Sequence, residues 1–210
     1  AAITGTNGKT TTTALTGEIL KAKYEETFVV GNIGDPYTSR VLEMTEDSVT
    51  VAEVSSFQLE TIMDFRPNVS AILNITPDHL NRHGTMENYT RIKECITLNQ
   101  TEDDSVVLNY DDPVLREFGQ DPDLKPKVTW FSSREKLADG FCMSGDNIVY
   151  CQKGRETILV NVRDMKLLGR HNYENVMAAA AIGFLMGVAL ADIGRVAENF
   201  NPVEHRIEFV

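Results

Sequence analysis

Residues 4 to 11 of the sequence read Thr4-Gly5-Thr6-Asn7-Gly8-Lys9-Thr10-Thr11. This stretch follows a short run typical of a strand, and helical spacing begins at Thr10. Backbone N–H groups of such a loop can hold phosphate oxygens, and the helix start adds positive potential. Lys9 would then reach the outer phosphates of a nucleotide, and the Thr10 hydroxyl would bind Mg²⁺. The stretch predicts an α/β fold with a phosphate-binding P-loop.

The loop is a variant of the common nucleotide-binding pattern, which has glycine where this chain has Ile3. The alternative interpretation is a glycine turn that only joins a strand to a helix. The order of strand, loop, Gly-Lys-Thr and helix favours phosphate binding.

Beyond this loop, the sequence alternates between strand-like and helix-like segments. Strands are predicted over residues 1–4, 27–30, 48–54, 69–75, 106–109 and 128–131. Helices are predicted over residues 10–23, 55–63, 86–99, 173–186 and 191–199, the third with Thr85 as its N-cap. Residues 148–151 and 157–160 alternate around Lys153-Gly154 and indicate a hairpin. We therefore predict a mainly parallel sheet flanked by helices, with a small antiparallel addition near residues 147–161.

Composition limits the classes of function. The 210 residues are 42% hydrophobic and 24% charged, as in an ordinary globular domain. The formal net charge of −11 argues against nucleic-acid binding, because a phosphate backbone attracts a basic surface. No apolar run is long enough for a membrane span. Three scattered cysteines, Cys95, Cys142 and Cys151, fit reduced thiols and a cytoplasmic location.

We expect a single domain over residues 1–210 that belongs to a longer enzyme. The chain opens immediately before the phosphate loop, and residues 206–210 look like the start of a strand.

Four polar loops follow predicted strands, at residues 4–10, 31–34, 53–56 and 74–79. Ligands of parallel sheets lie beyond the carboxyl ends of the strands, so these loops are expected to converge on one edge. Glu53, at a strand end, suits Mg²⁺, and Ser55 can add a hydroxyl. The alternative is a solvated Glu53 with Ser56 as a helix cap.

Further candidate side chains lie in four segments. His79, in the 74–79 loop, can contact a cation or a substrate oxygen, although a lone loop histidine is more often a surface residue. Lys93 shares a helix face with Tyr89, and spacing alone makes it a surface lysine. Asn172 and Asn175 have amides suited to an adenine edge, although Asn172 also suits an N-cap. Arg206 can place a guanidinium on phosphates.

Taken together, these motifs resemble the Mur ligases, the ATP-dependent amide ligases of peptidoglycan synthesis. The resemblance runs from Ile3 to Arg206. The glycine loop is similar to the one shared by these ligases and folylpolyglutamate synthases. Three other segments are similar to the D-glutamate-adding members: Gly31-Asn32-Ile33-Gly34, Glu53-Val54-Ser55-Ser56-Phe57-Gln58-Leu59 and Asn74-Ile75-Thr76-Pro77-Asp78-His79-Leu80. Asn81 departs from the pattern, which usually has Asp there.

The resemblance implies a role for each candidate residue. Gly5, Thr6, Asn7, Gly8, Lys9, Thr10 and Thr11 would hold the phosphates, and Asn172, Asn175 and Arg206 the rest of the nucleotide. Glu53, Thr10, His79 and Lys93 would surround Mg²⁺, Lys93 as a carbamate. Asn32, Ser55 and His79 would contact the muramoyl substrate. Lys9, His79 and Lys93 would be the catalytic residues.

The resemblance also implies three domains, of which this chain supplies the second, between a UDP-binding and a closing domain. The implied substrates are ATP, UDP-N-acetylmuramoyl-L-alanine and D-glutamate. Alternatives are another ligase of the Mur type, a folylpolyglutamate synthase, or a non-catalytic nucleotide-binding module. The last needs only the Lys9 loop, so Glu53, His79 and Lys93 argue against it.

Overall fold

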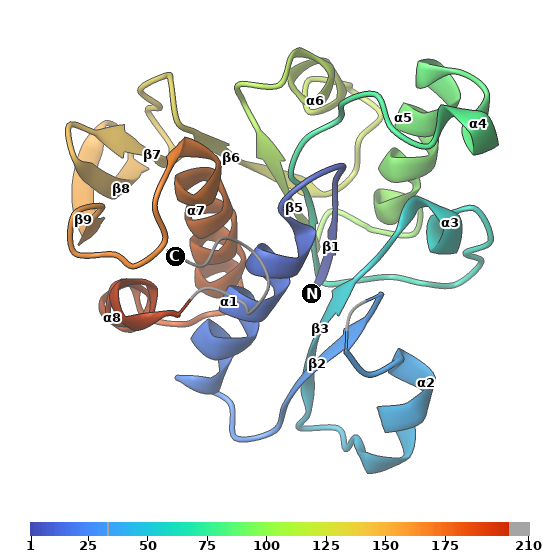
Figure 1. Cartoon of the computed structure of the whole chain (residues 1–210), viewed down its shortest axis with the longest axis horizontal. Coiled ribbons are helices and arrows are strands. Elements are labelled where there is room, and N and C mark those ends of the chain that lie inside the picture. Colours follow the sequence, from blue (N-terminus) through green and yellow to red (C-terminus); the bar gives the residue numbers. More distant parts are fainter. Residues whose placement is uncertain (33, 202–210) are drawn as a thin grey trace, which may run out of the picture.

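A computed structural model describes residues 1–32 and 34–201 of the chain. Its centre is a nine-stranded sheet in the order β2-β3-β1-β4-β5-β6-β7-β8-β9 (Figure 1). The strands are β1 (Ala2–Thr4), β2 (Thr27–Gly31), β3 (Val49–Glu53), β4 (Val69–Ile72), β5 (Ser105–Asn109), β6 (Lys127–Ser132), β7 (Gly140–Ser144), β8 (Asn147–Gln152) and β9 (Arg155–Asn161). Strands β1 to β7 pair in parallel, and β7, β8 and β9 pair antiparallel. The predicted α/β fold, with a mainly parallel sheet and an antiparallel addition, is confirmed.

Helices cover both faces of the sheet. They are α1 (Lys9–Lys21), α2 (Tyr37–Arg40), α3 (Ser56–Leu59), α4 (Leu80–His83), α5 (Met86–Glu94), α6 (Pro113–Phe118), α7 (Arg170–Leu185) and α8 (Leu190–Asn199). Short 3₁₀ turns, η1 (Val41–Glu43) and η2 (Cys95–Thr97), follow α2 and α5. Among the described residues, every helix is too short or too polar to span a lipid bilayer.

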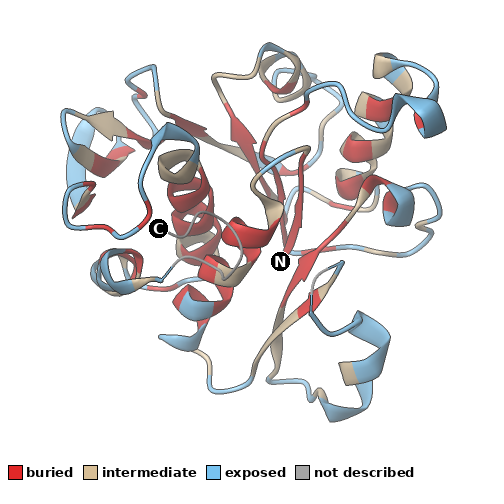
Figure 2. Cartoon of the chain, viewed as in Figure 1, coloured by how far each residue is buried: buried red, intermediate tan, exposed pale blue. Residues whose placement is uncertain are grey.

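Two apolar cores result from the alternation of side chains along the strands. Ile3, Val51 and Ala71 face α1, α7 and α8, whereas Ala2, Ala52 and Ile72 face α3, α5 and α6. Figure 2 shows α7 and the central strands buried, while α2 is mostly exposed.

Several predicted bounds need correction. The strand expected over residues 69–75 ends at Ile72, and the helix expected to reach residue 99 ends at Glu94. The antiparallel addition includes β7, which was not predicted. The short elements α2, α4 and α6 were also missed, because four to six residues carry too little periodicity. The strand expected at residues 206–210 lies outside the described residues.

Two local predictions hold. The Thr85 Oγ1 accepts from Asn88 N at 3.2 Å and caps α5. Lys153 and Gly154 both have positive φ, at 50° and 75°, which is the conformation of a tight hairpin turn between β8 and β9.

Candidate active site

The four predicted loops meet at the carboxyl ends of β2, β3, β1 and β4, since these parallel strands are neighbours. Asn7 N donates to Asn74 Oδ1 at 2.8 Å, and Thr6 N donates to the Asn74 carbonyl at 3.0 Å. On the other side of β1, Asn32 N donates to the Glu53 carbonyl at 2.8 Å. The convergence expected from the sequence is confirmed.

The glycine loop joins β1 directly to α1. Gly8 has φ 85°, in the left-handed region that favours glycine, and a side chain there would overlap Asn175 of α7. The first N–H groups of α1 therefore open toward the loop without intrahelical acceptors. Lys9 Nζ folds back over the loop and donates to the carbonyls of Gly5 (2.9 Å) and Thr6 (3.0 Å).

Glu53 is buried at the end of β3, with 3% of its surface exposed. Its carboxylate accepts from Thr10 Oγ1 at 3.0 Å and from Asn32 Nδ2 at 3.1 Å. Within residues 1–32 and 34–201 it forms no salt bridge. A buried carboxylate beside a hydroxyl, without a protein cation, is a set of oxygens that suits Mg²⁺. The alternative of a solvated Glu53 is wrong.

Ser55, not Ser56, caps α3. Ser55 N donates to Gln58 Oε1 at 2.9 Å, and Ser55 Oγ accepts from Gln58 N at 3.4 Å, which is a capping box. The Ser55 hydroxyl also donates to Gln58 Oε1 at 2.9 Å, so it is engaged within its own helix and not with Glu53.

Lys93 lies beneath the glycine loop. It is 2% exposed, and its Nζ donates to the Gly5 carbonyl at 2.9 Å and lies 4.7 Å from the Tyr89 ring centroid. Burial, and after it repulsion from the Lys9 ammonium, lowers the pKa of Lys93 from 10.5 to about 7, against an opposing attraction from Asp78. The expectation of a surface lysine from spacing alone is wrong, because the face it shares with Tyr89 is the buried face of α5.

His79 stands before α4 in a left-handed conformation with φ 50°, which is uncommon for a residue with a side chain. Its side chain is 47% exposed, with Nε2 3.5 Å from Asp78 Oδ2. Among the described residues, no three His, Cys, Asp or Glu side chains gather at one point. A Mg²⁺ ion at the candidate site would complete its coordination shell with water and substrate oxygens, as this ion usually does.

The start of α7 borders a cavity of about 350 Å³ beside the glycine loop. It is lined by Asn7, Gly8, Leu73, Asn74, Phe131, His171, Glu174 and Asn175. Of the two asparagines singled out in the sequence, Asn175 lines this cavity and Asn172 does not. The helix begins at Arg170, so Asn172 is inside its first turn and is not the N-cap, which is Gly169. Asn172 Nδ2 donates to the Leu168 carbonyl at 2.8 Å.

Sequence reasoning missed His171 and Glu174, which line this cavity. Both residues belong to the Gly169–Asn175 motif, which was a usable sequence signal. In a helix that begins at Arg170, positions 171, 174 and 175 share one face, and this face lines the cavity beside the glycine loop. Arg206 lies outside the described residues.

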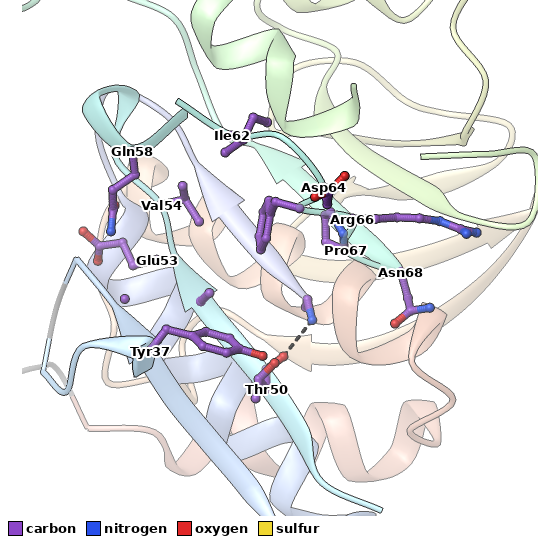
Figure 3. Close-up of a pocket in the computed structure, with 14 residues that line it drawn as sticks. Tyr37, Thr50, Glu53, Val54, Gln58, Ile62, Asp64, Arg66, Pro67 and Asn68 are labelled. Carbon is purple, nitrogen blue, oxygen red and sulfur yellow. Dashed lines mark hydrogen bonds between the residues drawn. The ribbon is translucent and has the colours of Figure 1, made fainter. Parts of the chain in front are cut away.

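A second cavity, of about 530 Å³, lies on the opposite face of the sheet (Figure 3). Glu53 and Gln58 lie near one end, and Asp64 to Asn68 line the other. Ala1 and Thr50 line the same cavity. Glu53 lines this cavity and is not among the lining residues of the cavity beside the glycine loop.

The geometry defines a mainly parallel α/β domain with a strand–glycine loop–helix unit at its functional edge. A family model, the Mur ligase middle domain, matches residues 3–183. The chain belongs to the Mur ligase middle-domain family.

Curated relatives agree over the whole chain. A UDP-N-acetylmuramoylalanine–D-glutamate ligase of Lachnospira eligens is 56% identical over 209 residues, covering 100% of this chain and 46% of its own length. The protein of that name from Lachnoclostridium phytofermentans is 53% identical over 211 residues, again 100% of this chain and 46% of its own length. The chain therefore spans about half the length of these relatives.

Solved structures agree on the fold. MurF from Acinetobacter baumannii superposes with a TM-score of 0.76 at 20% identity, covering 100% of this chain and 47% of that one. A pseudomurein peptide ligase type C from Methanothermus fervidus gives 0.72 at 21% identity, covering 99% and 50%. At this level of identity the likeness concerns the fold alone.

Proposed function

We propose that this chain is the central ATP-binding domain of a ligase that joins D-glutamate to UDP-N-acetylmuramoyl-L-alanine in peptidoglycan synthesis. The observation that carries the proposal is the grouping of the glycine loop with two buried ionisable groups, Glu53 and Lys93. A domain that only bound a nucleotide would not need either. The relatives at 56% and 53% identity support the choice of D-glutamate.

In the proposed reaction, the γ-phosphoryl group of ATP passes to the alanyl carboxylate. The amine of D-glutamate then attacks the acyl carbon, an amide forms, and ADP and phosphate leave. Lys9 and the loop amides stabilise the negative charge on the phosphoryl oxygens. Lys9 first has to exchange its bonds to the Gly5 and Thr6 carbonyls for phosphate oxygens.

Mg²⁺, when bound, would neutralise charge on the transferring phosphoryl group. Thr10 and Glu53 are the proposed ligands nearest the loop, and their hydroxyl–carboxylate pair already joins α1 to β3. His79 is proposed for a second cation or for the substrate. Asn32, hydrogen-bonded to Glu53, and Ser55 are proposed for the muramoyl side.

Lys93 is proposed to act as a carbamate. An uncharged amine attacks CO₂ and releases a proton, which converts a cation into a carboxylate that can face Mg²⁺. The lowered pKa supports this proposal, because the uncharged amine is far more populated at neutral pH than in an exposed lysine. A buried ammonium is also costly unless it is paired.

Asn175 and the cavity beside Gly8 are proposed for the adenine end of ATP. Asn172 and Arg206 remain proposed nucleotide contacts. We further propose that a UDP-binding domain precedes this one and a closing domain follows it. The activity would be cytoplasmic, where ATP is available.

The test is a panel of amino acids offered to the intact ligase with ATP and Mg²⁺, with either UDP-N-acetylmuramoyl-L-alanine or a folate as the carboxylate substrate. We expect ADP release that depends on D-glutamate. Preference for a diamino acid, or glutamate addition to a folate, would assign the chain to a different ligase of the superfamily. ATP binding without ADP release for any acceptor would indicate a non-catalytic module.

A further inference from the structure

His83 is a buried polar side chain that none of the proposed catalytic roles uses. It closes α4, and its side chain is fully buried, with 0% exposed. Its Nε2 lies 3.0 Å from Ser56 Oγ, and its Nδ1 lies 3.1 Å from Glu60 Oε1. Its backbone carbonyl accepts from Asn88 Nδ2 of α5 at 2.8 Å.

The imidazole ring is also held between two aromatic rings. Phe57 of α3 stacks on it with centroids 5.6 Å apart and planes at 22°, and Tyr89 of α5 lies 5.2 Å away. These contacts restrict the ring and connect it to α3 and α5 as well as to its own helix, α4. The residues Ser56, Phe57, Glu60, His83, Asn88 and Tyr89 are here named the α3–α4–α5 junction.

Glu60 is the acidic residue of the junction and lies next to the His83 ring. Arg82 Nη2 donates to Glu60 Oε2 at 2.7 Å, and this bond holds the pKa of Glu60 below its usual value. An ionised Glu60 favours the tautomer with hydrogen on Nδ1, so Nε2 is free to accept from the Ser56 hydroxyl. The Nδ1 contact with Glu60 is close but not aligned as a hydrogen bond, so it is mainly electrostatic.

The junction lies between the segments that carry the candidate site. Helix α3 begins directly after Glu53 and Ser55, α4 begins directly after His79, and α5 carries Lys93. Tyr89 extends the connection to the glycine loop, because its hydroxyl lies 3.3 Å from Thr6 Oγ1. A shift of the His83 ring would therefore move Glu53, His79 and Lys93 relative to one another.

We propose that His83 is a positioning residue, which sets the distance between the Glu53 loop and the His79–Lys93 segment. The effect on catalysis rests on the proposed ligase function, whereas the effect on the two segments does not. An ordinary core histidine would contribute stability alone, so the experiment separates stability from position.

The test compares His83→Phe, His83→Gln and Gln100→Ala. Phe keeps a ring between Phe57 and Tyr89 and loses both nitrogens, whereas Gln can still reach Ser56. Gln100 is the matched control, because it is a buried polar side chain, 1% exposed, with bonds to Ser70 Oγ and the carbonyls of Pro67 and Ser105 at the other end of the strands. Thermal unfolding first measures the stability lost by each variant.

Amide hydrogen exchange of this chain gives the readout that is independent of ligase activity. We expect His83→Phe to speed exchange in residues 53–62 and 76–94, His83→Gln to restore part of the protection, and Gln100→Ala to act only near residues 67–70 and 105. In the intact ligase we expect His83→Phe to lower kcat by about 10- to 100-fold, the range that follows when residues that orient metal ligands are substituted, with little change in KM for ATP.

Two results would overturn the proposal. One is unchanged exchange in both segments of folded His83→Phe. The other is a fall in kcat no larger than that of Gln100→Ala at an equal loss of stability. Absence of D-glutamate ligation by the unsubstituted enzyme would reject the proposed function, and the exchange measurement would still decide the role of His83.

Discussion

At the scale of single residues, the two lysines of the candidate site have opposite surroundings. Lys9 is partly exposed and bonded to loop carbonyls that a phosphate would replace. Lys93 is buried under the same loop and shares the Gly5 carbonyl. Burial, and after it repulsion from the Lys9 ammonium, lowers the pKa of Lys93, so the charge at Lys93 depends in part on Lys9.

Lys9→Ala should weaken binding of Mg-ATP while the fold survives. Hydrogen bonds to charged groups contribute about 1.5–3 kcal/mol, so we expect a loss of roughly 10- to 100-fold in affinity, measured by calorimetry. Lys21→Ala is the control, because Lys21 ends the same helix with only an exposed pair to Glu18. Unchanged affinity in a folded Lys9→Ala variant would contradict the role.

Lys93→Ala should abolish activity of the intact ligase, and acetate should restore part of it by supplying a carboxylate at the vacated position. Steady-state rates with increasing acetate measure the effect, with the unsubstituted enzyme as the control for acetate alone. Full activity of Lys93→Ala would reject the role of this side chain in the reaction.

Lys93→Met should stabilise the chain below pH 7 in buffer free of CO₂. The folded-state pKa of about 7 is below the unfolded value near 10.5, so between these pH values only the unfolded chain holds the proton. Stability of the unsubstituted chain therefore rises with pH across this window, and the advantage of Met shrinks. Each pKa unit corresponds to about 1.4 kcal/mol. Denaturant unfolding at pH 6, 8 and 10 checks this, and a difference independent of pH would contradict it.

At the scale of elements, helix α8 packs on β9 through a glycine. A side chain at Gly194 would overlap the Leu159 carbonyl, which is backbone and has little room to move. Gly194 therefore allows α8 to pack closely against the backbone of β9, and a larger residue would prevent this contact. This contact joins the antiparallel end of the sheet to α8.

Gly194→Ala should destabilise the chain although alanine favours helix. The gain in propensity is about 1 kcal/mol, and overpacking typically costs about 1–3 kcal/mol. Ala191→Gly, at an exposed position of the same helix, measures the propensity term by itself. A rise in the thermal midpoint of Gly194→Ala would show that α8 moves away from β9 without loss.

At the scale of the whole molecule, the candidate site is an open edge. Apolar side chains near this edge are exposed to solvent. Phe57 has 45% of its surface exposed and Leu80 has 38%. Amide formation requires the acyl phosphate and the amine to be held together, and positioning of this kind can contribute roughly 7–11 kcal/mol.

We expect this 210-residue chain by itself to fold and bind ATP weakly without making the amide bond. An open site would leave the acyl phosphate exposed to water. The assay mixes the purified chain with ATP, Mg²⁺, UDP-N-acetylmuramoyl-L-alanine and D-glutamate, with the intact ligase as control. Product at a rate near that of the intact ligase would show that this domain alone suffices.

The sequence by itself determined the parallel sheet, the glycine loop and the convergence of four loops on one edge. These follow from local patterns, because strand and helix periods repeat within a segment and parallel strands end at a common edge. The resemblance then pointed to Glu53, His79 and Lys93 before any geometry was known.

Only the tertiary structure decided which of these groups are buried and what they contact. Spacing alone made Lys93 a surface lysine, and nothing in the sequence singled out His83. The environment of a side chain comes from segments distant along the chain: Gly5 lies 88 residues from Lys93, and Ser56 lies 27 from His83. Burial and charge arise from those long-range contacts, and they set the lowered pKa of Lys93 and the restricted orientation of the His83 ring.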